Sequence, residues 1–480
     1  MRPYATAAAT AATVFLSALS AYAGGATLVV QKLGTGNGTV GSNPPGINCG
    51  ATCSATDKTS TSFFLTANGD AGSVFSGFGG ACATIGGVQP CTVQLQQDAQ
   101  VEAHFSTRVA VGGYHTCAIR IDGHVLCWGR NSDGQTGNGS TTTPVVRPEE
   151  VQGINNTVVA IATGGYHSCA ITLGSKVMCW GLNSDGQIGA GTWGAGHKEP
   201  APLSVTLSSP SPAVAIASGG YHTCALVADG TVECWGSNSK GQLGTSGGSR
   251  NNPTPVTGVN SAIAISAGDD FTCAILRENN GVKCWGKIPN ENPVPANPPG
   301  IPGDLSPAIA IASGVGVGEQ GFFLDLGGHH ACAVLSGGTA GCWGLGGAGQ
   351  LGEGRFDSQD ELTGVMTVKS LNNAIRIAAG AYHTCALIQG GTIQCWGHGG
   401  DGELGNGGSN DSNVPSKLSA PSGRSALGVA AGGYQSCAIM SPLPSEGPAP
   451  QVFCWGNNGD GQLGDGTRSG RSAPVQVTGL

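Results

Sequence analysis

The chain has little charge, few aromatic residues and almost no methionine. Of its 480 residues, 10% are charged, 5% are aromatic and 4 are methionine. No long basic run is present, which argues against binding of DNA or RNA through phosphate neutralisation. The net charge of -8 is scattered along the chain, so it indicates solubility rather than a particular partner. Helical periodicity is also lacking, and long amphipathic helices are therefore not expected.

Apolar runs long enough to span a membrane are absent as well. The first 23 residues instead contain Arg2, a run of small and apolar residues, and the triplet Ala21-Tyr22-Ala23. This arrangement is typical of a secretory signal with an A-x-A cleavage site, so we predict a signal peptide at residues 1–23. No cysteine follows that site, which argues against a lipoprotein. The mature protein is expected to be secreted or held in the cell envelope.

Glycine and cysteine are what the chain has in abundance, with 84 and 18 residues respectively. The glycines show no Gly-X-Y period, which excludes collagen, and they favour short strands joined by tight turns. An even number of cysteines in an exported chain favours disulfides over free thiols.

The string GGYHTCAIRIDGHVLCWG, at residues 112–129, occurs in seven variants along the chain. Its first cysteines are separated by 52, 55, 49, 59, 53 and 52 residues, and they are Cys117, Cys169, Cys224, Cys273, Cys332, Cys385 and Cys437. A period of about 50 residues is typical of propellers and solenoids.

Each repeat contains an apolar stretch such as VVAIAT, a hairpin from the first cysteine to CWG, and a further extended piece after a GQLG motif. Only the fourth repeat lacks GQLG and carries KIPNENPVPANPPGIPG instead. Four short strands per repeat correspond to one propeller blade. We therefore predict an all-β protein in which residues 24–107 form a small β domain and residues 108–480 form a seven-bladed β-propeller.

The register of the hairpin indicates whether the two cysteines of each repeat form a disulfide, remain reduced or bind a metal. A turn at Ile121-Asp122-Gly123 places Cys117 opposite Cys127 at a non-hydrogen-bonded site, where the Cα separation suits a disulfide. Left-handed turn glycines are expected at Gly123, Gly174, Gly230, Gly337 and Gly391. Reduced thiols are the second possibility, and zinc is disfavoured because the blades hold equivalent cysteines apart. The second cysteines of the predicted disulfides are Cys127, Cys179, Cys234, Cys284, Cys342, Cys395 and Cys454.

A histidine recurs two residues before the first cysteine in five repeats, while Phe271 and Gln435 take its place in two others. A catalytic residue is needed only once, so we predict a structural role in which each histidine bonds a backbone group of its own blade. The histidines are His115, His167, His222, His330 and His383. The Trp of CWG is interpreted as core. The Asp-Gly loops lack the carboxylates of a calcium site, and no metal or cofactor is expected.

The segment before the repeats holds four further cysteines, Cys49, Cys53, Cys82 and Cys91. Three pairings are possible, and the local ones, Cys49 with Cys53 and Cys82 with Cys91, are favoured; a zinc site built from both pairs is the alternative. The pattern of GTGNGTV, PPGINC, LTANGDAGSVFSGFGGAC and QVEAHF resembles the internalin-type B-repeat module of bacterial exported proteins. This resemblance implies a small β domain used for attachment or spacing.

The repeats, as in GGYHTCALVADGTVECWGSNSKGQLG, resemble the regulator of chromosome condensation repeat family. The resemblance implies a seven-bladed propeller, and we expect a last strand near residues 473–477 to complete the blade begun by residues 109–128. The family's roles in GTPase exchange and chromatin binding do not fit an exported acidic chain. Its tryptophan-based ultraviolet sensing does not fit GGYHT, which carries tyrosine. Its exported bacterial inhibitor of β-lactamases, which binds with one propeller face, fits the predicted compartment.

We accordingly predict a monomeric, non-catalytic scaffold that binds another protein through loops on one propeller face. Trp193, the one Trp outside CWG, is a candidate hot spot or a local packing residue. Asp269-Asp270 and Asp360-Glu361 are isolated acidic pairs, and no once-only catalytic constellation is found. An envelope hydrolase and a purely structural surface protein are the alternatives. The predicted specificity loops are residues 141–156, 193–211, 287–307, 314–326 and 441–451.

Overall fold

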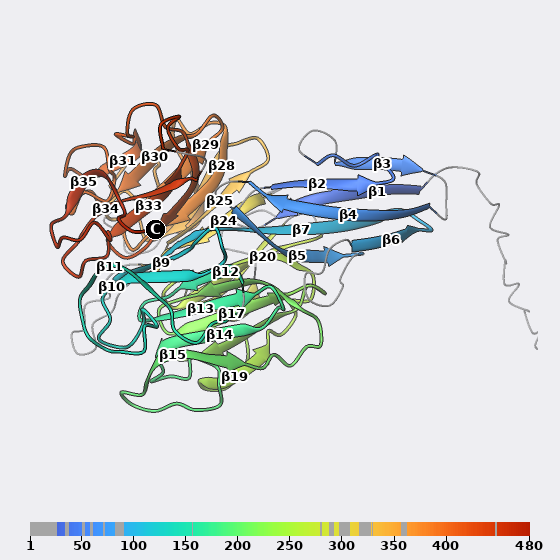
Figure 1. Ribbon diagram of the computed structural model, residues 1–480, viewed down its shortest axis with the longest axis horizontal. Coiled ribbons are helices and arrows are strands. Elements are labelled where there is room, and N and C mark those ends of the chain that lie inside the picture. The colour runs from blue at the N-terminus through green and yellow to red at the C-terminus, as the bar shows by residue number, and fades with distance from the viewer. Residues whose placement is uncertain are drawn as a thin grey trace, which may run out of the picture.

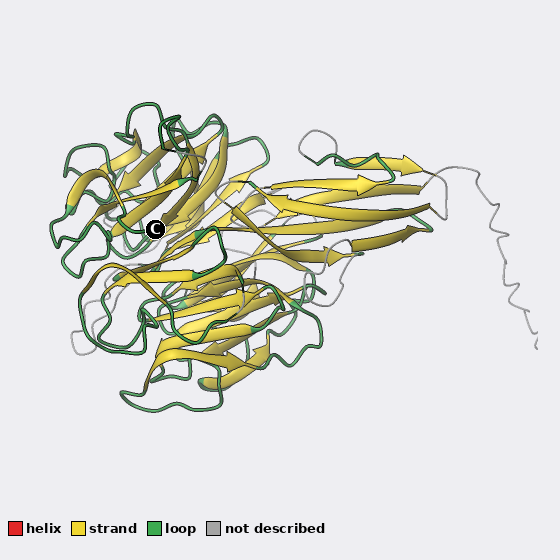
Figure 2. Ribbon diagram, in the orientation of Figure 1, coloured by secondary structure: helices red, strands yellow, loops and turns green. Residues whose placement is uncertain are grey.

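The structure is a computed structural model that describes most of the chain after residue 25. The described residues are 26–33, 38–49, 53–57, 61–70, 73–81, 91–155, 157–278, 281–287, 292–296, 308–315, 328, 330–356, 362–446 and 449–480. Within these ranges there is no helix of the length and apolar character that crossing a bilayer requires. The ordered elements are strands, β1 to β35, joined by loops (Figure 2). The predicted signal peptide lies outside the described residues.

The N-terminal strands form a sandwich of two sheets that projects from the rest of the molecule (Figure 1). One sheet has the order β3-β1-β7-β5 and the other β2-β4-β6. The core between them contains Leu28, Phe63, Leu65 and Phe105, all buried. The strands are β1 (Ala26–Leu33), β2 (Gly38–Asn43), β3 (Ser54–Asp57), β4 (Thr61–Gly69), β5 (Ser73–Gly80), β6 (Cys91–Leu95) and β7 (Ala99–Thr107).

The seven repeats form seven four-stranded antiparallel sheets within the described residues, and the predicted all-β propeller is confirmed. Blade 1 is β8 (Val109–Val111), β9 (His115–Ile119), β10 (Val125–Gly129) and β11 (Val145–Glu150). Blade 2 is β12 (Val158–Thr163), β13 (His167–Thr172), β14 (Val177–Leu182) and β15 (Lys198–Val205). Blade 3 is β16 (Ala213–Ser218), β17 (His222–Val227), β18 (Val232–Gly236) and β19 (Arg250–Pro255).

The remaining blades repeat this order. Blade 4 is β20 (Ala262–Ala267), β21 (Phe271–Leu276), β22 (Val282–Gly286) and β23 (Asn292–Ala296). Blade 5 is β24 (Ala308–Ser313), β25 (His330–Leu335), β26 (Ala340–Gly344) and β27 (Leu362–Thr367). Blade 6 is β28 (Ala374–Ala379), β29 (His383–Ile388), β30 (Thr392–Gly397) and β31 (Ser412–Lys417). Blade 7 is β32 (Ala426–Ala431), β33 (Gln435–Met440), β34 (Gln451–Gly456) and β35 (Arg471–Gln476).

The central hairpin of each blade has the register expected from its turn. Cys117 lies directly opposite Cys127, and the structure joins them in a disulfide with a Cα–Cα distance of 4.1 Å. The other six hairpins are joined in the same way, with Cα–Cα distances of 4.0 to 4.1 Å. Two turn glycines were placed wrongly, because the left-handed residues are Ser175 rather than Gly174 and Gly338 rather than Gly337.

The N-terminal sandwich lies against the end of the propeller where the innermost strands begin. Leu33 packs with Ile263 and Ala308, and Val74 packs against blades 1 to 3. Buried Glu102 on β7 makes an ion pair of 2.5 Å with Arg277 of blade 4. Beneath this junction the innermost strands surround a channel with a cavity of about 200 Å³, lined mainly by Ala, Ile and Val. One mouth of the channel is thereby covered.

The ring of blades does not close as expected. The last strand, β35, pairs with β34 of its own blade, so it does not complete blade 1. Closure comes from the loop before it, because the carbonyl of Gln462 accepts hydrogen bonds from Trp128 Nε1 and Thr116 Oγ1 of blade 1, both at 2.9 Å. In the six blades that have it, the GQLG loop, rather than an exchanged strand, bonds the Trp of the next blade.

Candidate functional site

The mouth of the channel opposite the sandwich is formed by the glycine pairs that end the innermost strands. In blade 1, the amide of Gly113 donates to the carbonyl of Gly164 in blade 2, and Gly433 of blade 7 donates to Gly112 of blade 1. A Cβ on Gly164 would lie 2.3 Å from the carbonyl oxygen of Gly219 in the next blade, so this close approach requires glycine. The remaining links of the ring are Gly165 to Gly219, Gly220 to Gly268, Asp269 to Gly314, Gly328 to Ala381 and Ala381 to Gly432.

A tyrosine stands at this mouth in five blades, after Gly-Gly in four of them and after Gly380-Ala381 in blade 6. Its backbone is held in place, since its carbonyl accepts a hydrogen bond from the residue after CWG; Arg130 donates to Tyr114 at 2.9 Å, and His398 donates to Tyr382 at 2.8 Å. We call this side of the propeller the tyrosine face, defined by Tyr114, Tyr166, Tyr221, Tyr382 and Tyr434.

The rings of the tyrosine face contact one another between neighbouring blades. The ring centroids of Tyr114 and Tyr166 are 6.2 Å apart, and those of Tyr166 and Tyr221 are 5.8 Å apart. On the other side of the face, the centroids of Tyr382 and Tyr434 are 6.3 Å apart. The guanidinium of Arg130 lies over the Tyr114 and Tyr166 rings, at 5.3 and 5.6 Å from their centroids. Such contacts are attractive through the ring quadrupole and hold the aromatic arc rigid.

Carboxylates border the same rings. Burial, followed by the charges of Asp269, Asp185 and Asp270 among other neighbours, raises the pKa of Tyr221 far above its usual range. Burial together with Asp401 and Glu403 likewise raises the pKa of Tyr434. Both phenols therefore stay protonated near neutral pH and can donate hydrogen bonds. The face combines apolar ring surface, phenol donors and negative charge.

The positions beside the tyrosines differ from blade to blade. The residue after CWG is Arg130, Leu182, Ser237, Lys287, Leu345, His398 or Asn457 in blades 1 to 7. The position before Gly-Gln in the GQLG loop is Asp133, Asp185, Lys240, Ala348, Asp401 or Asp460 in the blades that have this loop. The tyrosines of five blades thus stand beside a position after CWG whose residue varies, while Asp recurs in four of the six loops.

The recurring histidines are structural, but their bonding partner differs from the one predicted. Nε2 of His222 lies 2.7 Å from Oγ1 of Thr272 in the next blade, and that hydroxyl donates to the carbonyl of Gln242 at 3.0 Å. Backbone groups of the same blade are used by the sheet ladder, so the imidazole reaches across to the neighbour instead. Burial lowers the pKa to about 3 in His115, His167, His222 and His383.

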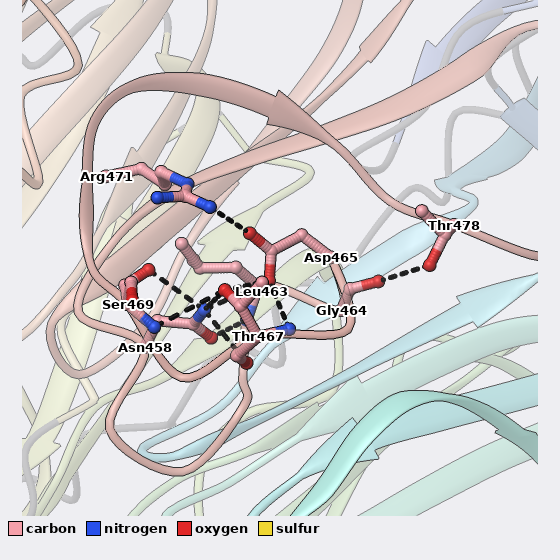
Figure 3. A network of polar contacts seen from close by, with 8 residues as sticks. All are labelled: Asn458, Leu463, Gly464, Asp465, Thr467, Ser469, Arg471 and Thr478. Atoms are coloured by element: carbon pink, nitrogen blue, oxygen red, sulfur yellow. Dashed lines mark hydrogen bonds and ion pairs between the residues drawn. The ribbon is translucent and has the colours of Figure 1, made fainter.

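Asparagine side chains stabilise the Asp-Gly loops that resemble calcium sites in sequence. Asn458 Oδ1 accepts from the Leu463 amide at 3.0 Å, and its Nδ2 donates to the carbonyls of Thr467 and Ser469 (Figure 3). Asp465 is in turn held by Arg471 at 2.9 Å. Equivalent bonds are made by Asn131, Asn183 and Asn238 in blades 1 to 3. The asparagine closes the turn, which agrees with turn chemistry as the explanation of these loops.

One cluster of side chains was missed by the sequence reasoning. In blade 6, His398 Nδ1 lies 2.7 Å from Glu403 Oε1, and ligand-type atoms of His398, Asp401 and Glu403 all lie within 4.8 Å of one another. The sequence does hold a signal, because GDGELG in this blade has Glu where the other GQLG loops have Gln. In the sequence, His398, Asp401 and Glu403 considered one at a time show no pattern that points to a shared site.

Trp193 lies in the loop between β14 and β15, and 49% of its surface is exposed. Strand β14 ends at the tyrosine face, where the amide of Leu182 bonds the carbonyl of Tyr166, so this loop leaves the blade on that side. Asp269 and Asp270 lie at the same mouth, since the Asp269 amide bonds the Gly314 carbonyl of the ring and the Asp270 carbonyl accepts from the Lys287 amide. Asp360 and Glu361 lie outside the described residues.

Some predicted specificity loops contain regular structure. Residues 141–156 and 193–211 include the outer strands β11 and β15, and residues 287–307 include β23. Most of residues 314–326 lie outside the described residues. In the N-terminal sandwich, Cys49 is joined to Cys53, and Cys91 is disulfide-bonded while Cys82 lies outside the described residues.

Comparison with known proteins gives a consistent result for the repeats. The profile of the regulator of chromosome condensation (RCC1) repeat matches residues 122–171, 176–226, 229–275, 340–387, 391–439 and 451–480. A second profile of this repeat matches residues 107–135, 158–187, 213–242, 262–292 and 374–403.

Relatives and solved structures extend the likeness over most of the chain. The chain is 27% identical over 395 residues to the Ultraviolet-B receptor UVR8 of Arabidopsis thaliana, covering 78% of this chain and 81% of that protein. It is also 27% identical over 383 residues to the RCC1 domain-containing protein RUG3, mitochondrial, of the same plant, covering 78% of this chain and 70% of that protein. The crystal structure of Prp20p from Saccharomyces cerevisiae, studied for its binding to Gsp1p and histones, matches with a TM-score of 0.57 at 21% identity, covering 68% of this chain and 80% of that one.

Proposed function

Because the chain belongs to the regulator of chromosome condensation (RCC1) repeat family, we propose that it is an exported, non-catalytic scaffold that binds a protein partner on its tyrosine face. Export is inferred from the predicted N-terminal signal sequence and from the cysteines paired in every blade. The relative Prp20p binds proteins, which is consistent with this role. Fold alone does not assign a function, so the proposal rests on the site itself.

The observation that carries the proposal is the combination of tyrosines in five blades with a residue after CWG that varies among the blades. Rigid aromatic side chains provide contact area at low entropic cost, while the varied neighbours provide specificity. Arg130 is stacked on Tyr114 and Tyr166, and carboxylates border both Tyr221 in the same arc and Tyr434 on the other side of the face. Such a surface suits a partner of mixed charge. The opposite mouth of the channel is covered by the N-terminal sandwich, which leaves the tyrosine face for the partner.

Site-specific photo-crosslinking in the producing cells tests this assignment. A benzophenone amino acid is placed at Arg130 or Trp193 on the proposed side, and at Ile121 as the control. Ile121 is 72% exposed but lies at the hairpin tip at the other end of blade 1. We expect a defined crosslinked protein from positions 130 and 193 and none from position 121. Equal crosslinking from all three positions would refute a partner site on this face.

A matched pair of substitutions gives the second readout. Arg130→Glu reverses the charge over the Tyr114 and Tyr166 rings, and it should weaken binding of the crosslinked partner at least tenfold. Ile121→Ala should leave binding unchanged. If the purified protein cleaved a polysaccharide or peptide panel and lost that activity on mutation of one carboxylate, the role would be that of an envelope hydrolase instead.

A further inference from the structure

Blade 6 departs from the repeat at a position where the other GQLG loops carry a neutral amide. The glutamines there are Gln135, Gln187, Gln242, Gln350 and Gln462, and each accepts a hydrogen bond at Oε1 from the backbone amide two residues earlier, at 2.8 to 2.9 Å. Glu403 makes the same bond with Oε2, which lies 2.9 Å from the Asp401 amide. A single acceptor oxygen is therefore sufficient to bond the backbone amide of this loop, and the fold does not require an ionisable side chain at this position.

The second carboxylate oxygen of Glu403 contacts an ionisable side chain instead of the loop backbone. The side chain is only 1% exposed, and Oε1 lies 2.7 Å from Nδ1 of His398. Asp401, from the same loop, brings a second carboxylate into the group, and its ligand atoms lie within 4.8 Å of those of the other two residues. Burying a carboxylate is unfavourable unless it is paired or coordinates a cation. Two carboxylates and one imidazole nitrogen converge where the other blades place a neutral amide.

We propose that His398, Asp401 and Glu403 form a binding site for one divalent transition-metal ion of the Zn²⁺ type. An imidazole nitrogen with carboxylate oxygens suits Zn²⁺ and its neighbours, whereas Ca²⁺ and Mg²⁺ prefer oxygen ligands alone. Tetrahedral ligands at about 2.0 to 2.2 Å from a metal lie roughly 3.4 Å from one another, so His398 Nδ1 and Glu403 Oε1, now 2.7 Å apart, must separate slightly while Asp401 moves toward them. Asp401 is exposed, so its side chain has room to turn inward.

The surroundings hold the ligands in place. Nδ2 of Asn457, in blade 7, donates to Oδ1 of Asp401 at 3.1 Å, which is the kind of outer contact that orients a metal ligand. A Cβ on Gly400 would lie 2.7 Å from Cε1 and 2.8 Å from Nε2 of His398, so the glycine leaves space for the imidazole.

The site belongs to the tyrosine face but does not depend on a partner. The imidazole of His398 and the ring of Tyr382 are 6.4 Å apart between centroids. Three protein ligands leave at least one coordination position for water or for a side chain brought by a partner. Metal binding by the isolated chain can therefore be measured whether or not the proposed partner exists.

Blade 7 offers a matched control. Its loop has the same backbone pattern, but Asn457 stands at the position of His398, Asp460 at that of Asp401 and Gln462 at that of Glu403. Glu403→Gln gives blade 6 the residue found in the other GQLG loops, and so it should fold normally. Asp460→Asn removes one negative charge from the equivalent loop without touching the proposed ligands.

The experiment is calorimetric titration of the full exported chain with ZnCl₂, after removal of bound metal by a chelator and without a histidine tag. We expect one site, at least about 100-fold weaker in Glu403→Gln and unchanged in Asp460→Asn. Co²⁺ should give visible absorption bands in the wild type that Glu403→Gln lacks.

Absence of Zn²⁺ binding in the wild type, or equal affinity in the wild type and Glu403→Gln, would overturn the site and leave a simple His–Glu pair. Should Glu403→Gln fail to fold, His398→Asn, which copies blade 7, carries the same test. A loss of affinity there supports the site, and an unchanged affinity refutes it.

Discussion

Acid should unfold this protein through its buried histidines. His222 is fully buried, and its Nε2 lies 2.7 Å from the Thr272 hydroxyl. That hydroxyl donates its single proton to Gln242, so Nε2–H must be the donor in the bond between them. Burial holds the imidazole neutral and lowers its pKa to about 3. In the unfolded chain, the same side chain titrates with a pKa of about 6.5.

The sign of the effect follows from proton uptake. Between pH 6.5 and 3 the unfolded chain binds a proton at this histidine and the folded chain does not, so the free energy of unfolding falls as the pH falls. From pH 7.5 to 5.0 each such histidine costs about 2 kcal/mol. Four histidines share the pKa of about 3, which makes the expected loss about 8 kcal/mol. This is comparable with the whole stability of an ordinary domain.

The chain itself suggests the variants. Phe271 and Gln435 occupy the histidine position in blades 4 and 7, so His222→Phe and His222→Gln should both fold. Urea unfolding with the disulfides intact, followed by tryptophan fluorescence, is measured at pH 7.5 and pH 5.0. We expect the stability difference between the two pH values to shrink by about 2 kcal/mol in both variants. An unchanged difference in both would show that His222 does not remain neutral in the folded protein, and the reasoning would fail.

Two further predictions concern the glycine ring and the N-terminal sandwich. Gly164→Ala places a Cβ 2.3 Å from the Gly219 carbonyl and should destabilise the fold by about 1 to 3 kcal/mol in urea unfolding, while Gly174→Ala, which meets nothing within 4 Å, should be neutral. Equal effects would contradict the close approach of the blades. Arg277→Ala removes the 2.5 Å ion pair of buried Glu102 and leaves it the longer contact of 3.8 Å with His104, so it should speed amide exchange in β7. Adding Glu102→Gln should reverse most of that change because no buried carboxylate then lacks a close cationic partner. No change in exchange would mean that the pair does not hold the sandwich.

Periodicity made the propeller predictable. A repeated hairpin of fixed length has only one register that buries both cysteines and the apolar residues beside them, so the pairing of Cys117 with Cys127 can be read from spacing. The disulfide partners and the structural role of the repeated His and Trp follow from the same local geometry. At Ser175 and Gly338 the prediction failed because it followed the glycine one residue earlier, whereas the left-handed residue stands six positions after the first cysteine in each of these hairpins, as in blade 1.

Contacts between blades could not be derived in this way. The sequence shows that a histidine recurs, but the hydroxyl it bonds belongs to the next blade, 50 to 56 residues further along. Closure of the ring depends on Gln462 reaching Trp128, which lies 334 residues away in the sequence. Such bonds depend on the rotation between adjacent sheets, a quantity that no local pattern contains.

The amino-acid sequence by itself determined the number of blades, the hairpin register and its disulfides, because strand pairing and turn geometry are local. The tertiary structure alone decided which mouth of the channel is covered, since that depends on how the N-terminal sandwich docks. It also decided that the tyrosines form one surface and that His398, Asp401 and Glu403 meet on it. The roles proposed for these residues depend on their being neighbours in space, and that proximity depends on the curvature of the loops and on the closing of the ring.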